Sequence, residues 1–301
     1  MINDLNIIEK RQEILRVIAF YDIFDAPLTI LEIKNQLNID VSLMEIEDIL
    51  NKEILDSQIS LANGWYFLKG RGDIISIRRQ RYNYSLKKIK IARFFAKIFS
   101  QLPFVLVIYT CRSSSVYNFR KESDIDFFII TKDKRIWLSR LFLAGLTKFL
   151  NKRPNKKTKK DKICLSFYVS ENNLDLSSLK VKDGDPDFEF WQKNLLLLYN
   201  RNNTHQKFLN INNLNKQFKD NKVVLNEGTN KSGLFSKILD SLEKMSFKFQ
   251  LKIMPPYLQL AVNDQGNVKG VIFNENIIKL HLRDPRLKIK ELYEEKIKRL
   301  S

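Results

Sequence analysis

The sequence predicts an α/β (α+β) protein, with a small mixed sheet in the middle of the chain and helical regions on either side. Residues 104–110, FVLVIYT, are apolar and rich in β-branched side chains, which is typical of a buried strand. Residues 123–126, Ser-Asp-Ile-Asp, lead directly into the apolar run 127–130, which predicts a second strand. Apolar residues at helical spacing precede and follow this central part. We expect four segments, at 1–70, 71–102, 103–182 and 183–301.

The first segment predicts three helices followed by a β-hairpin. Two of the helices begin with a hydroxyl residue and carry a glutamate three positions later, which is the pattern of a capping box. Asn63-Gly64 is the dipeptide typical of a tight hairpin turn. The expected helices cover 7–21, 30–37 and 42–54, with caps at Thr29–Glu32 and Ser42–Glu45, and the expected strands cover 59–61 and 65–68.

This arrangement resembles a winged helix-turn-helix, in which the third helix can enter a DNA major groove. Acidic side chains repel phosphates, and the third helix carries four of them against one lysine. This segment is therefore expected either to bind DNA or to serve in packing or protein contacts. The residues concerned are Glu45, Glu47, Asp48, Glu53 and Lys52.

The second segment predicts a basic helical connector over 71–100, in which arginines and lysines alternate with Tyr82, Tyr84, Phe94 and Phe95. Arginine beside aromatic rings is a combination that grips single-stranded nucleic acid or a nucleotide. The same pattern is also typical of a solvated cationic face above an apolar one.

Two carboxylates mark the candidate site. Successive side chains of a strand point to opposite faces, so Asp124 and Asp126 share one face. Two like charges held side by side cost free energy unless a cation lies between them. Mg²⁺ (or Mn²⁺) suits this position because it takes one or two carboxylates and completes its shell with water and substrate phosphates. An ion held in this way can offset the charge that develops during phosphoryl or nucleotidyl transfer.

The stretch resembles the nucleotidyltransferase superfamily related to DNA polymerase β. That family has a strand, a Gly-Ser pair opening a helix, a loop, and Asp-x-Asp on the next strand; here the pair falls on Ser113-Ser114. The resemblance implies a polymerase β-like mixed sheet with an N-terminal winged helix and a helical C-terminal region. It also implies that an NTP is the substrate and that Asp124 and Asp126 bind the metal. The nucleotide contacts it implies are Ser113, Ser114, Ser123, Arg112 and Arg140.

Two departures from the family concern the site. Serine replaces the glycine at position 113, where glycine lets the backbone approach phosphates closely. The family often places a third carboxylate on the next strand, predicted at 163–169, and none occurs there. Alternation assigns Cys164, Ser166 and Tyr168 to one face of that strand. The outer acids Asp161 and Glu171 are weak substitutes. We expect these two changes to weaken catalytic turnover more than they weaken nucleotide binding.

The last segment predicts helices joined by polar linkers, and a short hairpin near the end. Asp187 is expected to cap a helix over 188–200, and Pro255-Pro256 to end a helix over 235–251. His281 lies among leucine and isoleucine, a setting that favours a structural role over a catalytic one. The other expected elements are strands over 271–273 and 277–280 and a final helix over 289–300.

Composition limits the class of protein. The formal net charge of +18 suggests a polyanionic partner, although a lysine- and isoleucine-rich chain also follows from A/T-rich coding DNA. Cys111 and Cys164 have no metal-site or disulfide spacing and are expected to be free thiols in a reducing cytoplasm. The sequence has no apolar run long enough to span a bilayer, so no membrane partner is expected. The oligomeric state is left open.

The sequence therefore predicts a Mg²⁺-dependent nucleotidyltransferase that moves a nucleoside monophosphate from an NTP to an unidentified hydroxyl. The acceptor class stays open among an RNA end, a protein side chain and a small molecule. The alternative is a catalytically degenerate protein of the same fold that acts as a nucleic-acid-binding or regulatory module. A scaffold whose charge reflects coding bias alone is a third possibility.

Overall fold

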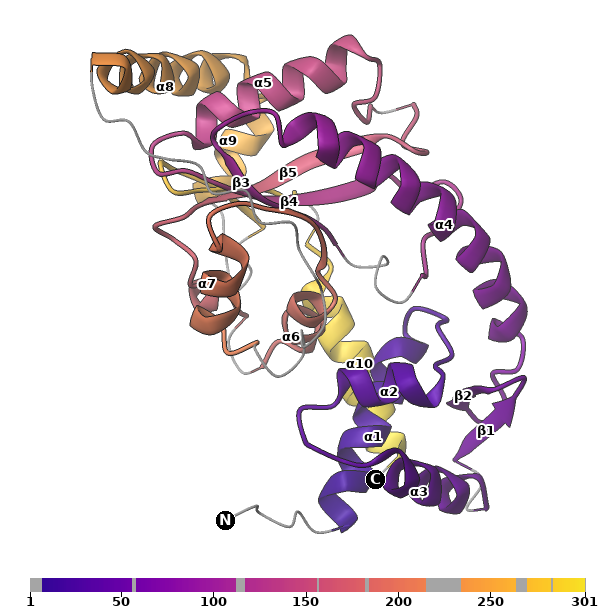
Figure 1. The fold of residues 1–301 in the computed structure, drawn as a ribbon. Helices are drawn as coiled ribbons and strands as arrows, with labels where there is room; N and C mark the ends of the chain where they lie inside the picture. Colours follow the sequence, from indigo (N-terminus) through magenta and orange to yellow (C-terminus); the bar gives the residue numbers. More distant parts are fainter. Residues whose placement is uncertain are drawn as a thin grey trace.

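The computed structural model describes residues 7–55, 58–111, 117–155, 157–181, 184–214, 234–263, 270–282 and 284–300. The predicted α+β class is confirmed, since helices surround one mixed sheet (Figure 1).

The N-terminal part forms three helices and a hairpin, as predicted. Both parts of the capping box at α2 are present: the Thr29 hydroxyl accepts from Glu32 N, and the Glu32 carboxylate accepts from Thr29 N. Asn63 and Gly64 both have positive φ, 55° and 78°, which a tight two-residue hairpin turn requires. The elements are α1 (Ile7–Asp22), α2 (Ile30–Gln36), α3 (Leu43–Leu55), β1 (Ile59–Ala62) and β2 (Trp65–Leu68).

Helix α4 (Ile74–Phe99) connects this part to the sheet, and three of its cations make contacts inside the molecule. Arg78 is 3% exposed and pairs with Glu32 at 2.5 Å. Arg81 bonds to the Phe24 carbonyl at 2.6 Å. Lys88 is 1% exposed and bonds to the Ser123 carbonyl at 2.6 Å. These three cations hold the N-terminal helices and the entry to the sheet together, so they are not a solvated basic face.

Within the described residues, the main sheet has six strands in the order β6-β3-β4-β5-β8-β7. The β4–β5 pair is parallel and the other four pairs are antiparallel. Parallel neighbours need a crossover, and α5 (Ile136–Phe149) supplies it. The strands are β3 (Val105–Thr110), β4 (Ile125–Thr131), β5 (Ile163–Ser170), β6 (Leu196–Asn200), β7 (Val271–Phe273) and β8 (Ile277–Leu280).

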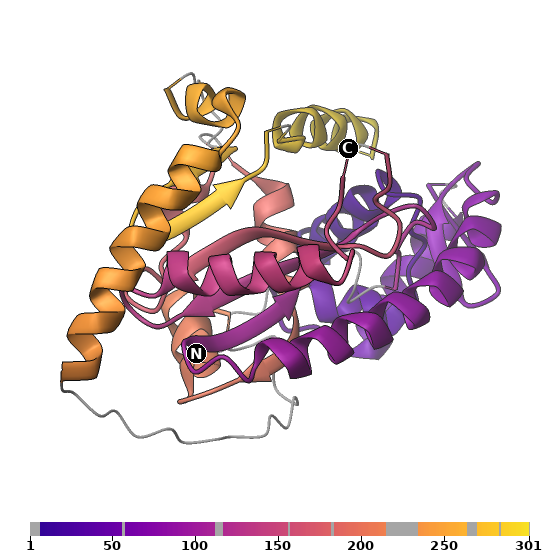
Figure 2. The same cartoon turned by 90° about the horizontal axis from the view of Figure 1, so that it is seen from above.

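Helices cover both faces of the sheet (Figures 1 and 2). One face packs against α4, α5 and α8 (Leu234–Ile253) through a core that includes Phe99, Ile129 and Trp137. The other face packs against α6 (Pro186–Lys193) and α7 (Thr204–Ile211) through Phe128, Phe188 and Phe208. Both cores contain fully buried side chains, which fixes the sheet between two layers. Helix α9 (Pro256–Asn263) follows α8, and a short 3₁₀ turn, η2 (Ser177–Leu179), precedes α6.

The predicted helix over 188–200 is wrong in its second half. Helix α6 ends at Lys193, and Leu196–Asn200 form β6, which pairs with β3. The run Leu195–Leu198 is compatible with either state, and pairing with the free edge of β3 selects the strand. The predicted cap at Asp187 is also wrong: Asp185 accepts from Phe188 N at 3.0 Å, with Pro186 in the first turn.

The C-terminal region is therefore not only helical, because it contributes β6, β7 and β8 to the sheet. The predicted strands at 271–273 and 277–280 are confirmed, and β8 extends the sheet by pairing with β5. The last helix, α10 (Arg286–Leu300), then returns to α1. Arg16 donates to the Tyr293 hydroxyl at 2.9 Å, and Lys296 pairs with Asp22 at 2.5 Å. The final helix thus joins the N-terminal helices in one core.

The face assignment predicted for β5 is wrong beyond Ser166. Asp126 pairs with Cys164 but Phe128 pairs with Phe167, so β5 carries one extra residue there. Such a bulge reverses the alternation that follows it. Tyr168 consequently lies in the core beneath α5, whereas Phe167 lies on the same side as Phe128.

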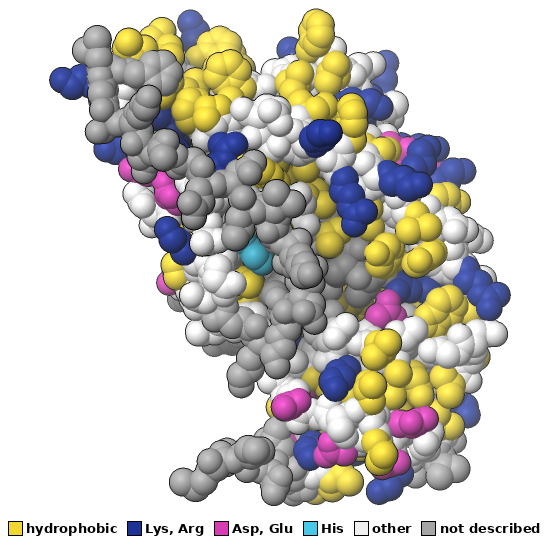
Figure 3. All heavy atoms as spheres, viewed as in Figure 1, with side chains coloured by type: hydrophobic (Ala, Val, Ile, Leu, Met, Phe, Trp, Pro, Cys, Tyr) yellow, Lys and Arg dark blue, Asp and Glu magenta, His cyan; other side chains and the backbone are white. Residues whose placement is uncertain are grey.

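Apolar and basic side chains share the part of the surface formed by α8 and α5 (Figure 3). On α8, large apolar side chains recur at helical spacing and are each more than 40% exposed: Ile238, Leu242, Met245, Phe249 and Ile253. None of the described helices combines the length and the apolar surface needed to cross a bilayer.

His205 gives the fold an expected pH dependence. It lies beneath the sheet with its Nδ1 2.8 Å from the Tyr109 hydroxyl, and burial lowers its pKa to about 4. In the unfolded chain this histidine is protonated below about pH 6.5, whereas in the folded protein it stays neutral down to about pH 4. The free energy of unfolding should therefore fall as the pH drops from about 6.5 to 4. The expected loss is about 2 kcal/mol, discounted for partial solvent screening. Urea unfolding at pH 7 and pH 4.5 should show a smaller loss in His205→Asn than in the wild type. Equal losses in both proteins would contradict the assignment.

Candidate metal centre

Asp124 and Asp126 lie at the entry to β4 and face the same side of the sheet. Ile125 between them is fully buried on the other side, and its N–H donates to the Lys162 carbonyl at 2.8 Å. The apolar residues that follow anchor the strand in both cores. The sheet therefore fixes the position of both carboxylates, which are themselves half-buried.

Cys164 is the third member of this group. It pairs with Asp126 in the parallel register of β4 and β5. One ligand atom each from Asp124, Asp126 and Cys164 lies within 4.8 Å of the others. Strand β5 carries no carboxylate, and the register places the Cys164 thiol beside Asp126 instead.

The two acids considered as substitutes for the third carboxylate are engaged elsewhere. Asp161 pairs with Lys88 at 2.7 Å, and its N–H donates to the Ser123 carbonyl. Glu171 lies beyond the opposite end of β5, where its carboxylate accepts from Asp133 N at 3.2 Å. Neither belongs to the group around Asp126.

Ser166 and His281 extend the polar group along β5. The Ser166 hydroxyl lies 2.8 Å from His281 Nε2 and 3.3 Å from Cys164 Sγ. His281 follows β8, where its backbone N–H donates to the Gly270 carbonyl at 2.9 Å. Pairing of β8 with β5 thus brings a histidine from near the end of the chain to the site.

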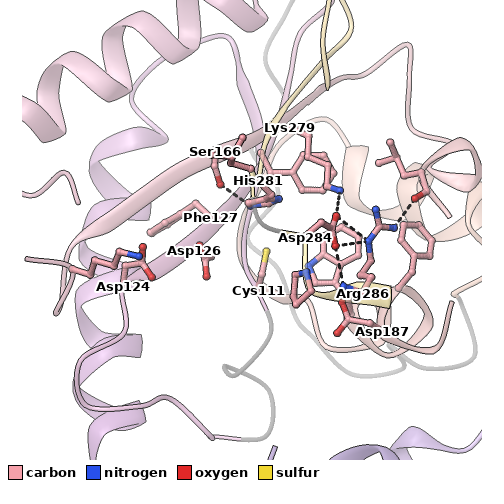
Figure 4. A pocket seen from close by; sticks show the side chains of 17 residues that line it. Cys111, Asp124, Asp126, Phe127, Ser166, Asp187, Lys279, His281, Asp284 and Arg286 are labelled. Atoms are coloured by element: carbon pink, nitrogen blue, oxygen red, sulfur yellow. Dashed lines mark hydrogen bonds and ion pairs between the residues drawn. The ribbon is translucent and has the colours of Figure 1, made fainter. Parts of the chain in front are cut away.

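A cavity of about 480 Å³ opens beside these residues. Figure 4 shows Asp124 and Asp126 on one side of it, His281 and Ser166 between, and Lys279, Asp284 and Arg286 on the other side. Asp284 pairs with both cations, at 2.8 Å to Lys279 and 2.9 Å to Arg286. The exposed Lys159 also lines the cavity, near the carboxylate pair. The volume is in the range of small-ligand sites.

The electrostatics indicate a place for a cation. Burial, followed by repulsion from Asp126, raises the pKa of Asp124 to about 6, although Lys159 and Lys88 act in the opposite direction. Burial, and then the charges of Asp126 and Asp124, raise the pKa of the Cys164 thiol as well. A divalent ion would relieve these penalties. Two adjacent carboxylates beside an open cavity fit Mg²⁺ or Mn²⁺, which keep several positions for water and phosphate.

The metal-free protein should become more stable when Asp124 is replaced by asparagine. The folded-state pKa lies above the ordinary value, so the penalty is absent below about pH 4 and complete above about pH 6. We expect Asp124→Asn to raise the unfolding free energy at pH 7.5 by about 1–2 kcal/mol, after discounting for solvent screening. Urea unfolding in EDTA measures this, with the exposed Glu122→Gln as control. A destabilised Asp124→Asn protein would contradict the stated electrostatics.

The residues predicted to contact the nucleotide do not all lie at the cavity. Arg112, Ser113 and Ser114 lie outside the described residues. Ser123 lies next to Asp124, but its hydroxyl donates to the Arg120 carbonyl at 3.0 Å. Arg140 lies on the opposite side of the sheet, 8% exposed, and donates to Gln250 of α8 at 2.5 Å. It does not line the cavity.

A second cavity of about 420 Å³ adjoins the first, since Asp187, Trp191 and Pro285 line both. It lies where α1, α6 and the start of α10 meet, and Arg81, Asn118 and Arg120 also line it. The two cavities together connect the carboxylate pair to the N-terminal helices.

Three cavity residues come from the end of β8 and the start of α10: His281, which the sequence favoured as structural, and Lys279 and Arg286, which no sequence pattern assigned to the site. The hairpin at 271–280 was the available signal, because a strand pair needs a sheet edge and the residues after it then lie near that sheet.

Comparison with protein-family models, with curated proteins and with solved structures finds no match.

Proposed function

We propose that this protein is a Mg²⁺-dependent (or Mn²⁺-dependent) nucleotidyltransferase that moves a nucleoside monophosphate from an NTP to a hydroxyl acceptor. The observation that carries the proposal is the pair Asp124 and Asp126 on one face at the entry to β4, beside a cavity of about 480 Å³. The connectivity supports the resemblance to the polymerase β-like family. Strand β3 is antiparallel to β4, and α5 leads to β5, which runs parallel to β4.

The chain's own residues divide into two groups in this proposal. Asp124 and Asp126 would hold the ion, whose chemistry when bound is to neutralise phosphate charge in the transition state. Lys159 lies where it can attract the triphosphate toward the carboxylates. The predicted phosphate contacts of Arg112, Ser113 and Ser114 remain part of the proposal. Arg140 is removed from it, because a buried side chain on the far side of the sheet cannot reach the phosphates.

The transfer itself is an in-line displacement. The acceptor oxygen forms a bond to the α-phosphorus, the bond from that phosphorus to the bridging oxygen breaks, and pyrophosphate leaves. The acceptor proton passes to solvent or to a basic side chain in the cavity. The adjoining cavity offers room for an acceptor group, and its volume suits a small molecule or a single side chain or nucleotide.

A nucleic-acid or protein acceptor remains within the proposal. The exposed face of α3 carries Glu47 and Asp48, which disfavours DNA reading by that helix. Lys87, Lys90 and Arg93 of α4 are exposed and provide a cationic surface for a polyanionic acceptor. Both cysteines are free thiols, which suits a reducing cytoplasm, and no membrane partner enters the proposal.

The alternative is a catalytically degenerate member of the fold that binds a nucleotide or nucleic acid in a regulatory role. One observation favours it: Cys164 occupies the position beside Asp126 where a third carboxylate would help hold the metal that activates the acceptor.

A transfer assay separates the two functions. NTPs labelled at the α-phosphate are incubated with Mg²⁺ or Mn²⁺ and a panel of RNA ends, proteins and small hydroxyl compounds, while pyrophosphate release is followed. We expect labelled acceptor and pyrophosphate in equal amounts, and neither with Asp126→Asn. Metal-dependent NTP binding without any release would favour the alternative. Absence of both binding and release in the folded protein would overturn both.

A further inference from the structure

The third side chain of the metal centre is a thiol, and this has consequences for the metal. Mg²⁺ is a hard ion that takes oxygen ligands, whereas thiolates select softer ions such as Zn²⁺ and Co²⁺. Cys164 is held beside Asp126 by the parallel register of two central strands, so its position does not depend on a loop. Asp161 and Glu171, the two acids that flank β5, are committed to other contacts.

The spacing fits a single ion with small side-chain adjustments. Ligand atoms of one tetrahedral zinc ion lie roughly 3.3–3.7 Å apart, as follows from bonds of about 2.3 Å to sulfur and about 2.0–2.2 Å to oxygen. The three atoms here lie within 4.8 Å of one another. Rotation about the side-chain bonds of the two aspartates can close that difference. Asp124 and Asp126 line the cavity, so on their side a fourth position would be open to water or a phosphate oxygen.

A second group of residues supports the orientation of the thiol. The Ser166 hydroxyl lies 3.3 Å from Cys164 Sγ and is itself held by His281 Nε2 at 2.8 Å. Hydrogen-bonded neighbours of this kind commonly orient metal ligands. They come from the same strand as Cys164 and from the end of β8, so strand pairing fixes them together.

We propose that Cys164 is the third ligand of this centre, and that Asp124, Asp126 and Cys164 together bind a thiophilic divalent ion such as Zn²⁺ or Co²⁺ in preference to Mg²⁺. On binding, the sulfur–metal bond forms and the thiol proton leaves to solvent. The inference rests on the metal centre of the proposed function, and it requires no nucleotide and no transfer. In Mg²⁺ alone the two carboxylates would hold that ion, and the thiolate would add affinity only for a softer one.

The test is a Co²⁺ titration of the full chain without nucleotide. Thiolate ligation gives a sulfur-to-cobalt charge-transfer band in the near ultraviolet, and the chain contains only two cysteines, Cys111 and Cys164. Cys111 is 5% exposed and lines the cavity together with Asp124 and Asp126, which makes Cys111→Ser a useful control. We expect the band in the wild type and in Cys111→Ser, and its loss in Cys164→Ser. Asp126→Asn should weaken Co²⁺ binding at least tenfold.

Competition tests the preference. Mg²⁺ in 100-fold excess should leave the cobalt band of the wild type unchanged. Cys164→Asp, which restores an oxygen ligand, should bind Mg²⁺ at least tenfold more tightly than the wild type by calorimetry. Thermal unfolding of each variant checks that it is folded.

Three results would overturn the inference: no charge-transfer band in the folded wild type, a band that persists in Cys164→Ser, or ready displacement of Co²⁺ by equimolar Mg²⁺. These outcomes are independent of the transfer assay. A cobalt band without nucleotidyl transfer would retain the thiolate ligand and remove the proposed reaction, whereas transfer without a cobalt band would do the reverse.

Discussion

Replacing Asp126 by asparagine is expected to lower the affinity of the protein for an NTP in Mg²⁺ by at least 100-fold. Asp126 is the central member of the metal centre, with Asp124 on the same strand face and Cys164 on the neighbouring strand. Asparagine keeps the shape and removes the charge, so the ion loses one of its two anionic oxygen ligands. The phosphates of the NTP then lose the cation that would offset their charge. Isothermal titration calorimetry of the wild type and the variant measures the difference.

The control for this prediction is Glu122→Gln. Glu122 lies in the loop before β4 and its side chain is 72% exposed, with a long contact of 3.8 Å to Lys160. It carries the same charge as Asp126 and lies close in sequence, but it does not line the cavity. An unchanged affinity in Asp126→Asn, or an equal loss in both variants, would remove Asp126 as a metal ligand.

The second large effect concerns stability. Arg286→Met is expected to lower the free energy of unfolding by about 3–5 kcal/mol, because it removes the cation that pairs with the buried Asp185 and one of the two that pair with Asp284. Arg286 is 5% exposed and donates to Asp284 at 2.9 Å, to Asp185 at 2.9 Å and to the Leu179 carbonyl at 2.6 Å. Asp185 also caps α6, so the arginine joins the start of α10 to the wall of the cavity. Urea unfolding followed by circular dichroism measures the loss.

The charge state of Asp284 supports this expectation. Burial raises its pKa, but hydrogen bonds from Arg286 and Lys279 more than offset that effect and hold the pKa well below the usual range. Arg299→Met is the matched control, since Arg299 lies on the same helix, is 75% exposed and pairs with the exposed Glu295 four residues before it. Its loss should cost less than about 0.5 kcal/mol. Equal losses in the two variants would contradict the role assigned to the buried arginine.

Local patterns were sufficient to predict most of the elements. The capping box at Thr29 and the Asn63-Gly64 turn each rest on interactions within a few residues, and both are present as predicted. The segment 196–200 was assigned wrongly because an apolar run fits a helix or a strand, and only the free edge of β3 decides between them. The bulge in β5 likewise depends on pairing with β4, which no local pattern encodes.

Local patterns also predicted part of the candidate site, and the part that depends on strand pairing could not be predicted. Asp124 and Asp126 share a face through strand alternation alone, and this local rule placed them together. The partners from β5 and from the end of β8 could not be found in this way. Cys164 needed the register of a parallel pair, and His281 lies 115 residues after Ser166 in sequence. Arg140 was assigned to the phosphates without knowledge of the face on which α5 packs, and α5 covers the side of the sheet away from the cavity.

The most direct test of the metal-nucleotide site is a calorimetric titration of the unmodified protein with each of the four NTPs, once in Mg²⁺ and once in EDTA. The predicted result is binding of at least one NTP in Mg²⁺ that disappears in EDTA, because Asp124 and Asp126 repel phosphates unless a cation lies between them. Two results would contradict the account: no NTP bound by the folded protein in Mg²⁺, or equal binding in the two buffers.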